Sequence, residues 1–178
     1  MNRRQLRSLV GQAHGFTLIE ILVVVVVTGL IMTSVVGITL SAMKSQNRTK
    51  SLNKISQNGV FILNELKRNI LNSNKIGISC PVTTGMSIGV TSLFDGDTSY
   101  IGCDSVTGKI SSVSAQRPAD VVILSGTEVT VSGCDNFVSC SISPSGEIVG
   151  VDFSFSLSAN TAGVGATKDF VETVTVRN

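Results

Sequence analysis

The feature that most limits what this chain can fold into is an uninterrupted apolar stretch near its beginning. Residues 21–43 contain 23 amino acids and no charged side chain, in a chain of 178 residues. At the helical rise of ~1.5 Å per residue, such a stretch spans the ~30 Å hydrocarbon core of a bilayer. It predicts one membrane-spanning helix, and the remaining length leaves room for one further domain.

Beyond this stretch the apolar residues become periodic, which predicts that the helix continues with a single apolar face. No proline interrupts residues 16–76. We therefore expect one helix, with a membrane-spanning half at 16–43, an amphipathic half at 44–76 and a stop at Gly77. The apolar positions of the second half recur at three- and four-residue steps and are Leu52, Ile55, Gly59, Ile62, Leu63, Leu66 and Ile70.

The remainder of the chain, residues 77–178, shows the period of β-strands. In "EIVGVDFSFSLSAN" apolar residues alternate with small or polar ones, so one face is core and the other is solvated. The apolar set is Val149, Val151, Phe153, Phe155 and Leu157. The sequence predicts an α+β fold, in which the long N-terminal helix packs on a C-terminal antiparallel β-sheet domain.

Turn signals divide this β-rich region into expected hairpins. The turn-rich "ANTAGVGATK" separates the alternating segment from "DFVETVTVRN", which we expect to be the second arm of a hairpin. Upstream, "ADVVILSGTEVTVSG" predicts a tighter hairpin that turns at Ser125 and Gly126. The segments "MSIGVTSLF" and "GKISSVSA" are weaker strand candidates.

The four cysteines all follow the apolar run: Cys80, Cys103, Cys134 and Cys140. An even count on one side of a membrane helix suggests two disulfides in an oxidising compartment, which places the C-terminal part outside the cytoplasm. Three pairings are possible, and sequence alone cannot choose among them. Cys80–Cys103 with Cys134–Cys140 is favoured because both close short local loops. A zinc site is disfavoured because the paired C-x2-C spacing is missing.

A short basic segment precedes the apolar run and ends in Gly15. It carries three arginines and no acid, which is the charge character of a targeting region. Gly15 is followed by "FTLIEILVVVVVTGLI", so that Glu20 lies at the start of the apolar run. An acidic residue in mid-membrane costs ~2.5–3.5 kcal/mol, and less near the interface, so a purely interfacial Glu20 is one interpretation.

This combination resembles the type IV pilin family, which includes type IV pilins and the pseudopilins of type II secretion. The resemblance is carried by the contiguous Gly-Phe-Thr-Leu-Ile-Glu and the long apolar helix. It implies that residues 1–15 are a leader and that a membrane-embedded prepilin peptidase cuts between Gly15 and Phe16. The same enzyme would N-methylate Phe16, and Glu20 would pair with the Phe16 amine of a neighbouring subunit.

Two glycines in the apolar run suggest a second comparison with this family. Many members carry a proline where Gly37 stands, and the helix there can unwind in the filament. Glycine lowers helix propensity by ~1 kcal/mol relative to alanine, so Gly29 and Gly37 are candidates for local melting. Equally, small residues let helices pack closely.

The resemblance also implies a place and partners for the chain. The position of the cysteines and the ending "FVETVTVRN" look more like minor pilins or J- and W-type pseudopilins than major pilins. The implied partners are other pilin or pseudopilin subunits, prepilin peptidase and an inner-membrane assembly platform. The implied location is the bacterial inner membrane, as a single-pass protein with its C-terminal domain outside the cytoplasm, and then a pilus or pseudopilus.

Catalysis and cofactor binding are not expected. The single histidine, His14, lies in the leader, which removes histidine-based catalysis from the mature chain. Asp95 and Asp97 flank Gly96 and are weak calcium candidates, but a polar turn is the preferred interpretation. Otherwise no metal or cofactor is expected. One tyrosine, no tryptophan and no basic run with interleaved aromatic residues argue against direct nucleic-acid binding.

Two other classes of protein compete with the filament subunit. One is a single-pass anchored β-domain that binds a ligand and never polymerises. The other is a secreted protein with an ordinary signal peptide. The second is disfavoured because the apolar run is too long, carries an acid near its start and lacks a clear small-residue cleavage site.

Overall fold

The computed structural model describes residues 15–80 and 86–176. Most of the expected leader, residues 1–14, and the last two residues of the expected C-terminal strand lie outside this range. The chain divides into two compact units between Met43 and Lys44, and each unit is described by itself.

One α-helix, α1 (Leu18–Leu71), contributes residues to both units. The predicted bounds of 16 and 76 were too wide. At its C-terminal end the Ser73 hydroxyl donates to the Ile70 carbonyl at 2.7 Å, a local bond that competes with further helix. Residues from Ser73 onward instead pair with a neighbouring strand, so the predicted stop at Gly77 was wrong.

The C-terminal half of α1 buries one face, as its periodicity predicted. Its buried residues are Ser51, Ile55, Gly59, Ile62, Leu66 and Ile70. Leu52 was predicted to be buried but is 39% exposed. The adjacent Ser51 is buried in its place, because its hydroxyl lies 2.9 Å from Thr161 Oγ1 and 3.1 Å from the Val164 carbonyl oxygen, so that its polar atom keeps partners.

The first sheet contains five antiparallel strands in the order β1-β2-β3-β4-β5. The bounds are β1 (Ser73–Ser79), β2 (Ser87–Ser92), β3 (Thr98–Asp104), β4 (Lys109–Ser114) and β5 (Val121–Ile123). The two weaker strand candidates of the sequence are β2 and β4, and both are confirmed. Ile88, Ile101 and Ile110 point into the core from the three middle strands.

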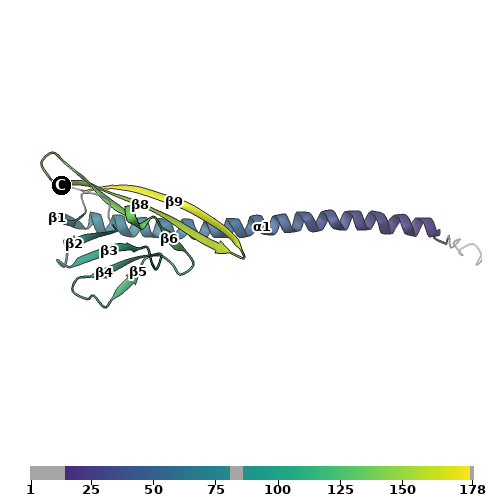
Figure 1. Cartoon of the computed structure of the whole chain (residues 1–178), viewed down its shortest axis with the longest axis horizontal. Coiled ribbons are helices and arrows are strands. Elements are labelled where there is room, and N and C mark those ends of the chain that lie inside the picture. The colour runs from purple at the N-terminus through teal and green to yellow at the C-terminus, as the bar shows by residue number, and fades with distance from the viewer. Residues whose placement is uncertain (1–14, 81–85, 177–178) are drawn as a thin grey trace, which may run out of the picture. The chain divides into compact units, whose positions relative to one another are not determined.

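The second sheet is built on a long central strand. β8 (Ile148–Thr161) pairs on one side with β9 (Val164–Thr175), and on the other with β6 (Thr130–Ser132) and β7 (Val138–Ile142). A short 3-10 helix, η1 (Cys134–Asn136), connects β6 to β7. In Figure 1 the β8–β9 hairpin crosses the C-terminal part of α1 obliquely, and the strands β2 to β5 lie below this part of the helix.

The β8–β9 hairpin confirms the predicted alternation and its second arm. Val151, Phe153, Phe155 and Leu157 are buried, whereas Val149 is exposed. The turn is tighter than expected, because both strands run through the turn-rich segment and meet at Thr161 and Val164. Ala162 and Gly163 between them both have positive φ, 50° and 79°, which suits the right-handed twist of a two-residue hairpin.

The hairpin predicted around Ser125 and Gly126 is wrong. Its first arm, β5, pairs with β4 in the first sheet, and its second arm, β6, pairs with β8 in the second sheet. The connecting segment is held by side chains instead of by strand pairing. Lys109 Nζ donates to the carbonyl oxygens of Gly126 and Val129, each at 2.8 Å, and Asn58 Oδ1 accepts the Gly126 N–H at 2.9 Å.

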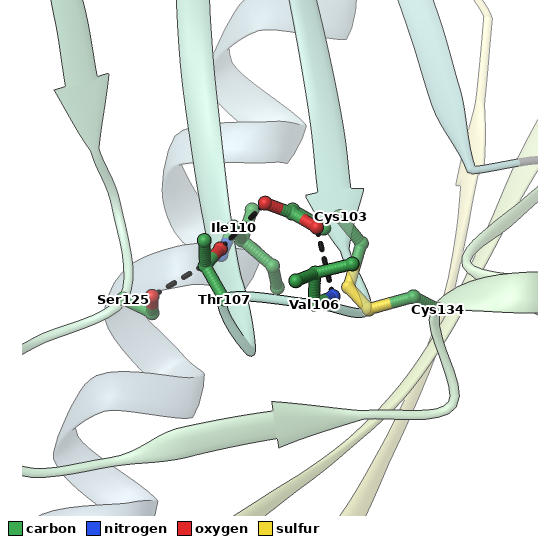
Figure 2. The surroundings of a disulfide bond; sticks show 7 residues. Cys103, Val106, Thr107, Ile110, Ser125 and Cys134 are labelled. Carbon is green, nitrogen blue, oxygen red and sulfur yellow. Dashed lines mark hydrogen bonds between the residues drawn. A yellow bond between two sulfur atoms is a disulfide. The ribbon is translucent and has the colours of Figure 1, made fainter.

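Two disulfides join the two sheets, and the favoured local pairing is wrong. Cys80, just after β1, is bonded to Cys140 on β7, and Cys103 on β3 is bonded to Cys134 on η1. Figure 2 shows the second bond beside the β3–β4 turn. Short sequence separation did not decide the pairing, because the fold brings residues 60 and 31 positions apart together.

Candidate functional site

The N-terminal end of α1 carries the motif that the sequence singled out. Gly15, Phe16 and Thr17 precede the helix, which begins at Leu18. The Glu20 backbone N–H lies 3.1 Å from the Thr17 carbonyl oxygen and 3.3 Å from Thr17 Oγ1. Thr17 is therefore the N-cap, whose hydroxyl and carbonyl oxygens both accept from the Glu20 N–H, one of the first backbone donors of the helix.

Sequence reasoning missed this role of Thr17, although the signal is present. Thr17 and Glu20 stand at the first and last positions of the T-x-x-E pattern of a capping box, directly before an apolar run. The acid in the first turn of α1 also complements the positive end of the helix dipole. Glu20 therefore has the position and the charge that favour the start of a helix, although no bond from its carboxylate to Thr17 closes the capping box in the described chain.

The polar side chains farther along the apolar half of α1 have hydrogen-bond partners within the helix, unlike the carboxylate of Glu20. Thr28, Thr33, Ser34 and Thr39 each donate to a backbone carbonyl one turn earlier, at 2.7–3.1 Å. Such bonds suit a helix in hydrocarbon, where water cannot serve as partner. Within the described part of the chain, the Glu20 carboxylate has no corresponding side-chain partner, so a contact outside the monomer could still engage it.

The expected cleavage position lies in exposed, non-helical chain. Phe16 is 76% exposed. A Cβ added to Gly15 would meet no atom within 4 Å, and Gly15 has no positive φ. Nothing in the monomer therefore requires glycine at position 15. The proposed processing at Gly15 and Phe16 stays a prediction. In that prediction the need for glycine at position 15 comes from the peptidase that cuts there, not from the fold of the chain.

Gly29 and Gly37 both lie within α1, which is continuous through them. A Cβ at either position would meet nothing within 4 Å. The monomer thus gives no packing reason for these glycines. Both explanations from the sequence, local melting and close approach of a neighbouring helix, stay predictions.

Asp95 and Asp97 lie in the turn between β2 and β3. Asp95 Oδ1 accepts the Asp97 N–H at 3.1 Å, and Asp97 Oδ2 accepts the Ser114 hydroxyl at 2.6 Å. The Ser92 hydroxyl and then the Asp97 N–H hold the pKa of Asp95 below its ordinary value. Within the described residues, no group of three or more potential metal ligands forms. The carboxylates act here as turn acceptors, and calcium binding stays a prediction.

By length and composition, α1 is the one helix of the described chain that is able to cross a membrane. The family model for the prokaryotic N-terminal methylation motif matches residues 11–36. This match covers Gly15, Phe16, the Thr17 cap and Glu20. Neither a curated protein nor a solved structure matches the chain. The N-terminal region of this chain is therefore a type IV pilin-like prepilin motif, continuous with a helix long enough to span a bilayer.

Proposed function

We propose that this chain is a minor pilin or pseudopilin, a structural subunit of a type IV pilus or a type II secretion pseudopilus. The observation that carries the proposal is the methylation motif at residues 11–36, contiguous with the apolar half of α1. In this account residues 1–15 are the leader, 16–43 the membrane and assembly segment, and 44–178 the extracytoplasmic part that starts with the amphipathic half of the helix.

The order of events follows from the chemistry of the motif. Prepilin peptidase at the inner membrane removes the leader and methylates the new N-terminus at Phe16. The methylated amine keeps its positive charge, so it can pair with Glu20 of another subunit in the low dielectric of a helix bundle. An assembly platform then inserts the subunit among other pilin or pseudopilin subunits. The role is structural, not enzymatic.

Substitutions at Glu20 test this account, because they separate its two possible roles. A capping box accepts glutamine as well as glutamate at its last position, whereas an ion pair requires the charge. If Glu20 pairs with an amine, Glu20→Gln will reduce incorporation into filaments as strongly as Glu20→Ala. If Glu20 only caps α1, Glu20→Gln will assemble like the wild type.

The assay is incorporation of the chain into filaments built with the other subunits of a host system, with membrane insertion and cleavage measured separately. Glu65→Ala is the matched control, because Glu65 also lies on α1 but forms its ion pair with Arg68 within the chain. Normal filament incorporation of both Glu20 variants would contradict the pairing. An anchored β-domain that never polymerises would give no incorporation even for the wild type.

A further inference from the structure

Toward the N-terminus, the buried face of α1 is followed by an exposed charged residue. Ile55 and then Ser51 continue this face toward the N-terminus, and Arg48 comes next, three residues before Ser51. Positions three and four apart lie on one side of a helix, so Arg48 lies on the side of α1 that contacts the β-domain. Arg48 is exposed, so it borders the contact between α1 and the β-domain and is not buried in it.

Arg48 lines a cleft instead of a packed contact. The cleft has a volume of about 620 Å³ and lies between α1, the β5–β6 connection and the β8–β9 hairpin. Small and hydroxyl-bearing residues form most of its wall, so a polar molecule can approach closely. Besides Arg48, the lining residues are Thr127, Glu128, Thr130, Ser158, Ala159, Asn160, Gly165, Ala166 and Thr167.

The described lining of the cleft holds one cation and one acid, and of these two only the cation has no ion pair. Its only acid, Glu128, is paired with Lys54 at 3.0 Å. Arg48 forms no ion pair with the described residues. No acidic residue occurs between residues 21 and 64, whereas Lys44, Arg48, Lys50 and Lys54 all follow the apolar run. The guanidinium of Arg48 is therefore available for an anion.

The residue types favour a phosphate that carries hydroxyl groups. The planar fork of an arginine matches the oxygens of a phosphate. Threonine and serine hydroxyls and the Asn160 amide can bond both phosphate oxygens and the hydroxyls of a polyol. A plain carboxylate would use the arginine but leave most of these polar groups without a role.

The position of Arg48 along α1 indicates where such a phosphate is found. Arg48 follows Met43, the last residue of the apolar run, by five residues. This corresponds to a helical rise of about 7.5 Å. The headgroup layer on each side of a bilayer is of similar thickness, about 5–8 Å. A side chain at this position is at the level of lipid phosphates.

We propose that this cleft binds the headgroup of an anionic phospholipid with a polyol head, such as phosphatidylglycerol, in the leaflet at which the C-terminal unit emerges. Arg48 binds the phosphodiester, and the hydroxyl-bearing residues and Asn160 bind the glycerol hydroxyls. This contact lasts until the subunit leaves the bilayer. The proposal rests on the membrane-anchored stage of the proposed function.

The test uses the full-length chain in nanodiscs of phosphatidylcholine that contain a minority of phosphatidylglycerol. Native mass spectrometry counts the lipids that each protein retains. Loss of a charge-assisted phosphate contact is expected to lower retained phosphatidylglycerol about tenfold in Arg48→Gln. Lys50→Gln is the matched control, because it removes the same charge two residues away but does not line the cleft; its retention should stay within about twofold. Thermal unfolding shows whether both variants are folded.

Four results would overturn the proposal. Equal loss in both variants would show only general attraction to an anionic surface. Displacement of the bound lipid by an excess of inorganic phosphate in detergent would show that the cleft binds free anions as well as it binds the lipid. Failure of the wild type to enter nanodiscs would contradict the membrane-anchored stage itself, whereas insertion without a preference for phosphatidylglycerol contradicts only the cleft.

Discussion

The aromatic ring of Phe170, on β9, covers the backbone of Gly59, on α1. A Cβ at position 59 would lie 2.1 Å from Cζ and 2.2 Å from Cε1 of Phe170. The Phe170 ring is also stacked on Phe155, with their centroids 5.4 Å apart, so it has little room to move away. The glycine therefore sets how closely the second sheet approaches the helix.

Gly59→Ala is expected to destabilise the domain, although alanine favours helix by ~1 kcal/mol. Overpacking of a filled core costs about 1–3 kcal/mol. Urea unfolding of the full-length chain in detergent, followed by circular dichroism, measures the difference. In a Phe170→Leu background the penalty should fall or reverse. A stable Gly59→Ala protein with Phe170 intact would show that the ring does not limit this contact.

The disulfide pairing has a sharp chemical test. Trypsin leaves Cys80 and Cys103 together in residues 76–109, and Cys134 and Cys140 together in residues 110–168, because Arg117 precedes a proline. The two inter-sheet bonds predict that these peptides stay linked until they are reduced. Local pairing would release them as two separate peptides.

A second digestion distinguishes the two pairings that link the sheets. Cleavage before aspartates separates all four cysteines, at Asp95, Asp97 and Asp104 in the first peptide and at Asp135 in the second. The fold predicts fragments joined through Cys80–Cys140 and Cys103–Cys134. A fragment that joins Cys80 to Cys134 would contradict the arrangement of the sheets.

Lys109 is expected to stabilise the crossing between the two sheets. Its Nζ donates to two carbonyl oxygens in the β5–β6 connection. Hydrogen bonds to charged groups contribute about 1.5–3 kcal/mol, so Lys109→Met should lower the free energy of unfolding by about 2 kcal/mol. Lys67→Met, at an exposed helical lysine, should change it by less than about 0.5 kcal/mol. Equal effects of the two changes would rule out a specific role for Lys109.

Thr17 is expected to hold the first turn of α1. Removing an N-cap side chain costs about 1 kcal/mol, so Thr17→Ala should raise the exchange rate of the Glu20 amide about fivefold in micelles. Thr28→Ala removes a hydroxyl that bonds only to the Val24 carbonyl, and it should leave the Glu20 amide unchanged. An unchanged rate in Thr17→Ala would show that the cap does not protect this turn.

Local patterns predicted the parts of this fold that depend on neighbours in sequence. The three- and four-residue steps identified Ile55, Ile62 and Leu66 on the buried face, and the period of two identified Phe153 and Phe155 on β8. The capping pattern at Thr17 was equally readable and was overlooked. The pattern predicted that Leu52 is buried, but the neighbouring Ser51 is buried instead. The Ser51 hydroxyl has two hydrogen-bond partners that are distant in sequence, which allow a serine at this position.

Long-range pairing could not be predicted in the same way. The chain leaves the first sheet after β5 and enters the second at β6, and no local signal distinguishes this crossing from a hairpin turn at Gly126. The disulfides depend on the same arrangement, since Cys103 lies on β3 of the first sheet and Cys134 lies between two strands of the second sheet. The candidate site at residues 15–20 was readable because all of it is local.

The most direct test of the account is the N-terminus of the processed chain. The full-length chain is co-expressed with a prepilin peptidase, and its intact mass and N-terminal peptide are measured. Gly15→Val should block cleavage, whereas Gly11→Val, a glycine within the leader, should not. The account predicts loss of residues 1–15 and one added methyl group on the amine of Phe16. An uncleaved wild-type chain, or one cut at another bond, would contradict it.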